Sequence, residues 1–360
     1  MKHNCKMGYT NSQCCLERAL VLYLPCGLGY SPSGFQRKLH LSVLIEKCFS
    51  LINRIYKWVS NSIRKKEMGF NKENSNSPRI YENIGPTAAL VSYYRSFSDI
   101  PFARQVSDII QAKEIAKNLI VNDDAHLARM LVAFEARFKS VDSVLKKYPH
   151  INRFIEIPAG FSTRGMAMTA DNSGIKYVEC DLPAILREKQ KLVVELFSST
   201  NKSEKPDLRF CPASILDFDQ LRLAASNLGE EPIAVITEGL FSYLTPQEKA
   251  VAAKNIHALL KERKGVWIVT DLTRIFKPND SKATELRERI STQTGFSPIT
   301  GCFASVSEAK KFFEHFGFTV RDYRRSEVIA SLSTTKTSML KEREIEKLLE
   351  PQATFALEVR

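Results

Sequence analysis

Short apolar runs alternate with longer stretches of helical periodicity through residues 152–360. Runs with the length and apolar content of buried strands occur at 154–157, 175–180, 208–213, 232–238 and 265–271. Apolar residues repeat every three or four positions, as in amphipathic helices, at 124–148, 182–196 and 305–316. A last segment, 354–359, alternates apolar and polar residues and predicts a closing strand. This order predicts an α/β fold in which helices cover a mostly parallel sheet.

The stretch 152–183 carries the first chemical signal. It predicts a strand, a tight turn, a helix and a second strand, with Glu156 near the end of the first strand and Gly160 in the turn. Asp181 ends the second strand. A glycine lets the backbone approach a ligand closely, and an acid at the second strand end can accept hydrogen bonds from both ribose hydroxyls. The pattern therefore suits an adenosine-type ligand, and an ordinary βαβ unit without a ligand is the alternative.

Two other phosphate-binding motifs are excluded at this turn. A dinucleotide fingerprint needs three closely spaced glycines, whereas this turn has only Gly160 and Gly165. A P-loop ends in Gly-Lys-Ser/Thr, whereas Met166 follows Gly165. An uncharged or cationic adenosine ligand remains, and S-adenosylmethionine is the common one.

Three segments together resemble a known family: FIEIPAGFSTRGMAMT at 154–169, YVECDLPAILREKQKLV at 177–193 and VITEGLFSYLTPQE at 235–248. They are similar to the leucine carboxyl methyltransferase family, which includes bacterial-type O-methyltransferases, and the likeness covers roughly residues 84–272. The resemblance implies a Rossmann-like class I methyltransferase fold, with a seven-stranded, mostly parallel sheet and an N-terminal helical cap. It also implies S-adenosyl-L-methionine as cofactor and O-methylation of a carboxylate or hydroxyl, on a small molecule or a protein C-terminus.

The resemblance assigns roles to further residues. Arg137 aligns with the arginine that binds the methionine carboxylate of the cofactor in relatives, and a guanidinium suits that task because it grips a carboxylate with two hydrogen bonds. Arg129 and Arg153 are competing candidates. Ser214 stands where the family usually has an acid that contacts the adenine, so this contact would be uncharged. Glu238 matches the acid that faces the sulfonium end of the cofactor.

The sequence leaves the catalytic groups open. A carboxylate acceptor is already ionised at neutral pH and needs no base, whereas a hydroxyl acceptor would normally need one, often histidine. The histidines fall in the first 75 residues or within or beside expected helices, which favours a carboxylate or an acidic phenol: His3, His40, His126, His150, His257 and His315. Glu238 or Tyr243 could still serve as the catalytic group. Pro158, Ser162 and Ser214 depart from the family pattern, so a catalytically degraded, methyltransferase-like binding protein is the alternative function.

Charge divides the chain into two parts. The net charge is +12, but residues 1–75 hold twelve Lys and Arg against four Asp and Glu, whereas the rest holds forty against thirty-six. We therefore expect a basic leader at 1–75 and a methyltransferase domain at 76–360, with a helical cap at 76–150 and an α/β core at 151–360. The nearly balanced charge of the domain gives no reason to expect a nucleic-acid partner.

The leader contains a basic amphipathic pattern at 41–66. Such a helix can make a peripheral contact with an anionic membrane or dock on a partner. It could equally pack on its own domain, or it could precede the natural start, since Met68 lies just upstream of the family-like region. The eight cysteines form no CxxC pair and no metal-ligand spacing with histidine, so we expect no metal site and a cytoplasmic location.

Overall fold

The structure is a computed structural model that describes residues 85–172, 174–198, 207–273, 280–295 and 302–360. The expected leader at 1–75 and the amphipathic segment at 41–66 lie outside these residues. No helix among the described residues is long and apolar enough to cross a bilayer.

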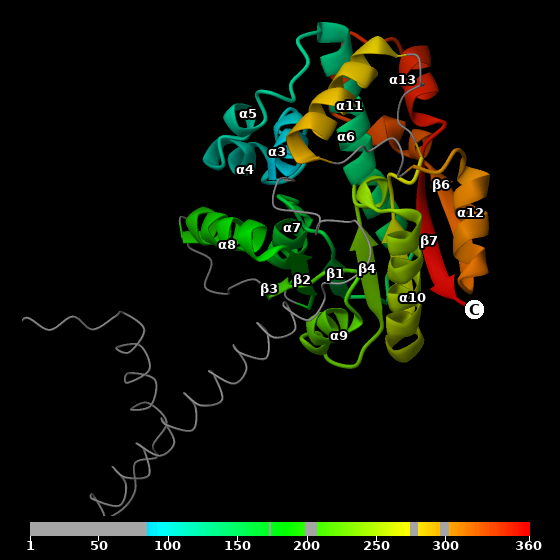
Figure 1. The fold of residues 1–360 in the computed structure, drawn as a ribbon. Coiled ribbons are helices and arrows are strands. Elements are labelled where there is room, and N and C mark those ends of the chain that lie inside the picture. The colour runs from blue at the N-terminus through cyan, green and yellow to red at the C-terminus, as the bar shows by residue number, and fades with distance from the viewer. Residues whose placement is uncertain (1–84, 173, 199–206, 274–279, 296–301) are drawn as a thin grey trace, which may run out of the picture. The chain divides into compact units, whose positions relative to one another are not determined.

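A seven-stranded sheet forms the centre of the described chain, in the order β3-β2-β1-β4-β5-β7-β6 (Figure 1). Its strands are β1 (Arg153–Glu156), β2 (Lys176–Asp181), β3 (Leu208–Pro212), β4 (Ile233–Thr237), β5 (Gly265–Val269), β6 (Phe318–Arg324) and β7 (Ala353–Val359). Strands β1 to β5 are parallel, whereas β7 runs antiparallel to both β5 and β6. This confirms the predicted mostly parallel sheet and the seven strands that the resemblance implied.

The chain reverses its direction of strand addition beside β1. Strand β1 pairs with β2 on one side and with β4 on the other, with Glu156 level with Glu179 of β2 and Ile236 of β4. In open sheets of this kind, ligands bind outside the carboxyl ends of the strands at such a reversal. The topology therefore brings Glu156, Asp181 and Glu238 to one edge of the sheet.

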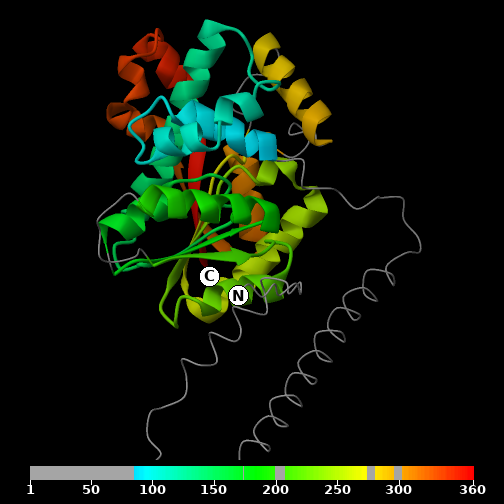
Figure 2. The same cartoon turned by 90° about the vertical axis from the view of Figure 1, so that its left-hand side faces the viewer.

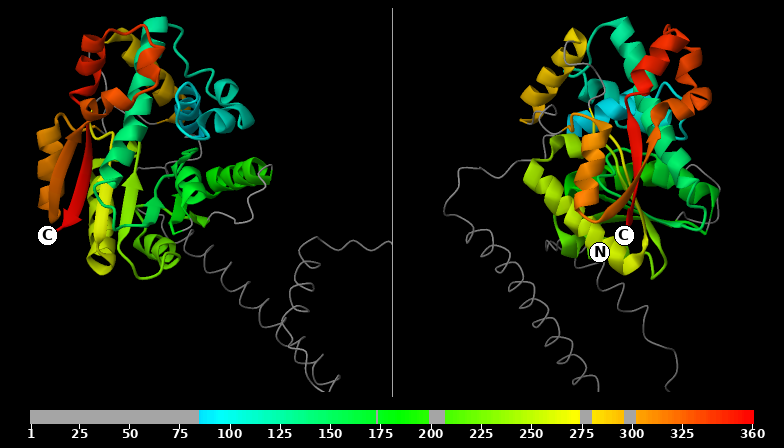
Figure 3. Two further views of the ribbon diagram at one scale, coloured as in Figure 1. Left: turned by 180° about the vertical axis from the view of Figure 1, so that it is seen from behind. Right: turned by 90° about the vertical axis from the view of Figure 1, so that its right-hand side faces the viewer.

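Helices cover both faces of the sheet, and the strand residues alternate between them. One face packs Ile155, Val235 and Trp267 against α9 (Phe218–Ser226), α10 (Pro246–Arg263) and α12 (Val306–His315). The other face packs Phe154, Ala234 and Val266 against α6 (Asp124–Leu145), which Figure 3 shows from behind. Helices α7 (Arg164–Asp171) and α8 (Pro183–Ser198) contact β2 and β3. Successive side chains of a strand point to opposite faces of the sheet, so a layer of buried apolar side chains lies on each face.

A layer of helices lies above the carboxyl ends of the strands (Figure 2). It contains α3 (Gly85–Arg95), α4 (Ala103–Ile109) and α5 (Ala112–Ile115), which precede the sheet as the resemblance implied. Segments from late in the chain join it: α11 (Ser281–Thr294), the 3-10 helices η3 (Arg325–Ser331) and η4 (Thr334–Lys336), and α13 (Glu342–Leu349). Both ends of the described chain therefore shape the space above the sheet.

Local sequence fixes the loop that follows β4. This loop contains the 3-10 helix η2 (Phe241–Tyr243) and ends where Thr245 caps α10. The Thr245 hydroxyl accepts from the Glu248 N–H at 3.2 Å, and the Glu248 carboxylate accepts from the Thr245 N–H at 2.7 Å. This reciprocal cap holds the start of α10, and with it the position of Tyr243.

Candidate functional site

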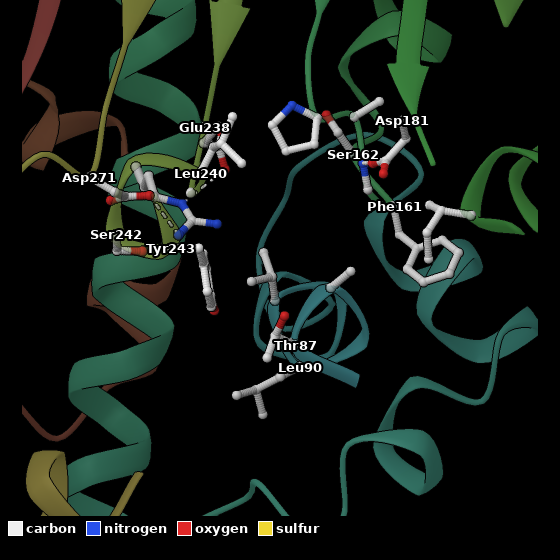
Figure 4. A pocket seen from close by; sticks show the side chains of 18 of the residues that line it. Thr87, Leu90, Phe161, Ser162, Asp181, Glu238, Leu240, Ser242, Tyr243 and Asp271 are labelled. Atoms are coloured by element: carbon white, nitrogen blue, oxygen red, sulfur yellow. Dashed lines mark hydrogen bonds and ion pairs between the residues drawn. The ribbon is translucent and has the colours of Figure 1, made fainter. Parts of the chain in front are cut away.

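A cavity of about 340 Å³ lies at the carboxyl ends of the strands, beneath the helical layer (Figure 4). That volume is within the range of pockets that hold small ligands. Every residue to which the sequence assigned a role lines it: Arg137, Glu156, Gly160, Asp181, Ser214, Glu238 and Tyr243. Figure 4 shows Asp181 and Ser162 on one side of the cavity and Asp271, Ser242 and Tyr243 on the other.

Asp181 organises the turn after β1. One carboxylate oxygen accepts from the Gly160 N–H at 2.6 Å and the other from the Leu182 N–H at 2.7 Å. Burial raises the pKa of Asp181 and these two N–H groups oppose the rise. Gly160 has a φ of 49°, a left-handed conformation that favours glycine. Because each carboxylate oxygen can accept more than one hydrogen bond, Asp181 is able to bind ribose hydroxyls without releasing the turn.

Glu156 faces partners inside the protein. Its carboxylate accepts from Arg164 Nη1 at 2.6 Å and from the Tyr177 hydroxyl at 2.8 Å, and the residue is only 1% exposed. Two strong hydrogen bonds to charged or phenolic donors compete with any ligand for this group. The structure therefore gives the Glu156 side chain a role in anchoring α7 beneath the turn.

Glu238 is the centre of a cluster of arginines. Its Oε1 contacts Arg95 Nη2 and accepts from Arg137 Nε at 2.9 Å, and its Oε2 accepts from Arg164 Nη2 at 3.3 Å. Burial would raise the pKa of Glu238, but the three positive charges outweigh it and hold the pKa well below its usual range. Glu238 is therefore a counter-ion that is charged near neutral pH, and a very weak base.

Arg137 is held so that part of its guanidinium remains available. Nε binds Glu238, Nη1 pairs with Asp271 Oδ2 at 2.8 Å, and the group lies over the Phe134 ring at 4.5 Å from its centroid. Burial lowers the pKa of Arg137, but the charges of Asp271 and Glu238 outweigh this and raise it. Among the described residues, Nη2 has no hydrogen-bond partner, so Arg137 fits a ligand carboxylate.

The two competing arginines lie elsewhere. Arg129 pairs with Asp280 at 3.1 Å, and Arg153 starts β1 at the opposite edge of the sheet, where it binds the Gly174 carbonyl at 2.9 Å and Glu231 at 2.8 Å. Neither residue lines the cavity. The structure therefore favours Arg137 among the three.

Ser214 and Tyr243 complete the polar lining that the sequence indicated. The Ser214 hydroxyl accepts from the Leu216 N–H at 3.2 Å, and its N–H donates to the Gln220 side chain at 2.9 Å. Burial raises the pKa of Tyr243, while a hydrogen bond with the Thr87 side chain opposes the rise. The Tyr243 phenol therefore keeps its proton near pH 7.

Sequence reasoning missed four members of the charged cluster. They are Arg95 and Arg164 around Glu238, and Asp271 and Arg325, which pair at 2.6 Å. They come from α3, α7, the end of β5 and η3, so no local spacing connects them. Asp271 was the last residue of the predicted strand 265–271, and that position was the one available signal.

Part of the chain matches a known protein family. Residues 95–257 match the family model described as leucine carboxyl methyltransferase. The match spans 163 of the 360 residues, less than half of the chain, and confirms the resemblance that the three sequence segments carry. S-adenosylmethionine is the cofactor of this methyltransferase. No curated protein matches the chain significantly in sequence.

Solved structures give more distant likenesses. A DUF574 family protein from Streptomyces avermitilis is 14% identical with a TM-score of 0.47, covering 76% of this chain and 97% of that one. An S-adenosylmethionine-dependent methyltransferase from Anabaena variabilis is 12% identical with a TM-score of 0.41, covering 63% and 86%. A structure titled PigF with SAH is 13% identical with a TM-score of 0.38, covering 83% of each chain. The family assignment rests on the family match, and the fold on the strand order of the chain itself.

Proposed function

We propose that this methyltransferase transfers its methyl group to a carboxylate, on a small molecule or at a protein C-terminus. The observation that carries the proposal is the chemistry of the titratable groups that line the cavity. A carboxylate is ionised at neutral pH and attacks without losing a proton, whereas an aliphatic hydroxyl needs a base. Apart from Asp181, which is assigned to the ribose hydroxyls, no acid, phenol or histidine of the described lining is suited to that task.

The acids and the phenol of the lining are unsuited for different reasons. Three arginines keep Glu238 charged, and the depressed pKa makes it a poor proton acceptor. Asp271 is tied between Arg137 and Arg325 at 2.8 and 2.6 Å. Tyr243 holds its own proton at neutral pH, because burial raises its pKa. None of the described histidines lines the cavity.

The residues present fit the cofactor. Asp181 would accept from the ribose hydroxyls, and the Nη2 of Arg137 would donate to the methionine carboxylate. Apolar side chains beside Asp181 would enclose the adenine, with Ser214 as an uncharged polar contact: Leu182, Ile185, Ile215 and Leu216. S-adenosylmethionine supplies an electrophilic methyl group on a sulfonium.

The protein itself has to orient the acceptor and exclude water. An acceptor oxygen forms a bond to the methyl carbon as the carbon–sulfur bond breaks, and the electron pair of that bond stays on sulfur. No proton is transferred, so placement and a dry cavity are the main sources of rate. Tyr243 would donate a hydrogen bond to the acceptor from the side of the cavity on which Asp271 also lies (Figure 4).

The chemistry of the product tests the proposal. The purified protein would be incubated with S-adenosylmethionine carrying a tritiated methyl group and with an extract of the source organism. Carboxyl methyl esters release volatile methanol in mild base, whereas methyl ethers do not. We expect base-labile label; label that survives base would contradict a carboxylate acceptor. Binding of the cofactor without any transfer would favour the degraded, non-catalytic alternative.

A further inference from the structure

Helix α11 forms one wall of the cavity. It begins after Asp280, whose side chain accepts from the Ala283 N–H at 3.0 Å, and it contributes Ala283, Leu286, Arg287 and Ile290 to the lining. Leu286 belongs to an apolar cluster that also contains residues of α3 and α6. Arg287 therefore lines the cavity from a helix that packs against α3 and α6.

Arg287 differs from the other arginines of the lining. Arg95 contacts Glu238, and Arg137 contacts Glu238 and Asp271. Arg287, by contrast, pairs with no carboxylate among the described residues. Its Nη2 donates to the Thr284 hydroxyl at 2.8 Å, and its Nη1 donates to no acceptor among the described residues. The Nη1 group on the cavity wall is therefore available to donate to an anion.

The surroundings of Arg287 place it away from the expected adenosine end. Its helix packs through Leu286 on Phe134 of α6, which lies beneath Arg137. Arg137 in turn contacts Asp271 at the end of β5, whereas Asp181 ends β2 on the far side of β1 and β4. Because the adenosine part is assigned to the Asp181 side, Arg287 faces the space that remains for the acceptor.

We propose that Arg287 binds the carboxylate of the acceptor, and that the rest of the acceptor is apolar. This inference rests on the proposed function and names the class of substrate and the residue that selects it. The apolar cluster to which its neighbour Leu286 belongs contributes Leu90, Val91, Met130, Phe134, Leu286 and Ile290 to the cavity wall. A guanidinium in such a wall discriminates strongly in favour of a carboxylate over an uncharged group of the same shape.

The arrangement is compatible with the methyl transfer. One carboxylate oxygen accepts from Arg287 while the other forms the bond to the methyl carbon. The carbon–sulfur bond breaks and its electron pair remains on sulfur. The products are a neutral methyl ester and a neutral thioether. Loss of the negative charge weakens the contact with Arg287, which favours release of the ester.

Binding of a simple probe tests this assignment separately from turnover. Octanoate and 1-octanol would be titrated into the full-length protein saturated with S-adenosylhomocysteine, using isothermal titration calorimetry. The variants are Arg287→Met, Arg287→Lys, and Lys282→Met as a matched control on the same helix. Lys282 is a half-exposed cation that contacts Glu285 at 3.2 Å and does not line the cavity.

We expect Arg287→Met to weaken octanoate binding by about tenfold or more, as for a lost charged hydrogen bond, and to leave 1-octanol within about threefold. Arg287→Lys should restore part of the octanoate affinity, and Lys282→Met should change neither ligand. Cofactor affinity should stay within about twofold of the wild type in all three variants.

Three results would overturn the assignment: no saturable octanoate binding by the wild type, equal losses for octanoate and 1-octanol, or a large loss of cofactor affinity in Arg287→Met. These are distinct from failure of the proposed function. Octanoate binding through Arg287 without any base-labile ester would support the binding site and contradict the proposed methylation of a carboxylate.

Discussion

Replacing Glu238 with glutamine should destabilise the protein strongly. The substitution keeps the shape of the side chain but removes the charge on which Arg95, Arg137 and Arg164 converge. The glutamate side chain is only 6% exposed, and the three arginines are 1–8% exposed, so water replaces little of the lost interaction. Neutral glutamine also places an NH₂ group against one of the guanidinium groups.

The magnitude follows from the burial of the cluster. Breaking a buried ion pair by removing one partner costs about 3–5 kcal/mol, because the remaining charge stays buried without compensation. Arg164 keeps Glu156 and Arg137 keeps Asp271, but Arg95 has no other acid among the described residues. At about 2–4 °C for each kcal/mol in a domain of this size, the melting temperature should fall by roughly 6–20 °C.

Thermal unfolding followed by circular dichroism at pH 7 measures this directly. Glu231→Gln is the matched control, since Glu231 also binds one arginine, Arg153 at 2.8 Å, but its side chain is 50% exposed. The control should leave the melting temperature nearly unchanged. The double variant Arg95→Met, Glu238→Gln should recover part of the loss, because it removes the cation left without a counter-charge. Equal melting temperatures for Glu238→Gln and Glu231→Gln would refute the reasoning.

The pH dependence has a definite sign. The folded pKa of Glu238 is depressed below its ordinary value of 4.5, so its contribution to stability is fully present above pH 4.5. That contribution is lost as the pH falls through the folded pKa. The difference in unfolding free energy between wild type and Glu238→Gln should therefore be constant from pH 8 to pH 5 and narrow only in stronger acid. If this difference in unfolding free energy grew as the pH was lowered, Glu238 would not be the charged group that stabilises the cluster.

Further predictions concern ligand binding and turnover. Asp181→Ala should weaken S-adenosylmethionine binding by about 1–3 kcal/mol, and an unchanged dissociation constant in the folded variant would argue against the ribose contact. Pro158→Gly should leave cofactor affinity within a few-fold, because the turn is tied down by the Ala159 and Gly160 N–H groups, at 2.8 Å to Cys180 and 2.6 Å to Asp181. Gly160→Val should abolish binding, since a branched residue is strained at a φ of 49°; a hundredfold gain for Pro158→Gly would point instead to a poor natural binder. Tyr243→Phe should lower kcat in the tritium-transfer assay at unchanged cofactor affinity, and an unaltered kcat would exclude Tyr243 as a catalytic group.

The sheet was predictable from sequence because each buried strand is a short apolar run with a recognisable end. Asp181 and Glu238 could be placed at one edge for that reason, since parallel strands bring their carboxyl ends together. The position of β7 between β5 and β6 depends on pairing between distant segments, which local patterns do not encode. The resemblance to a family implied seven strands, and the structure supplied their order. Helix α11 was missed because its apolar residues are few in a polar sequence: Ala283, Leu286 and Ile290.

The sequence indicated several residues that line the cavity, but neither the other members of the charged cluster nor their contacts. Glu156 and Glu238 are both strand-end acids, and both resemble ligand-facing residues in sequence. The fold brings Arg164 between them, so that each carboxylate already has a cationic partner at 2.6 and 3.3 Å. Arg95 reaches the same place from a helix more than one hundred residues earlier in the chain. These arginines meet the two acids only through tertiary packing, which the spacing of residues in one sequence does not predict.

Calorimetric titration of the full-length protein with S-adenosylmethionine tests the central claim most directly. We expect one binding site per chain that is saturated below millimolar ligand, and that is weakened in Asp181→Ala while Glu231→Gln binds as the wild type does. A folded protein that shows no binding at millimolar S-adenosylmethionine would contradict a cofactor site at the carboxyl ends of the strands.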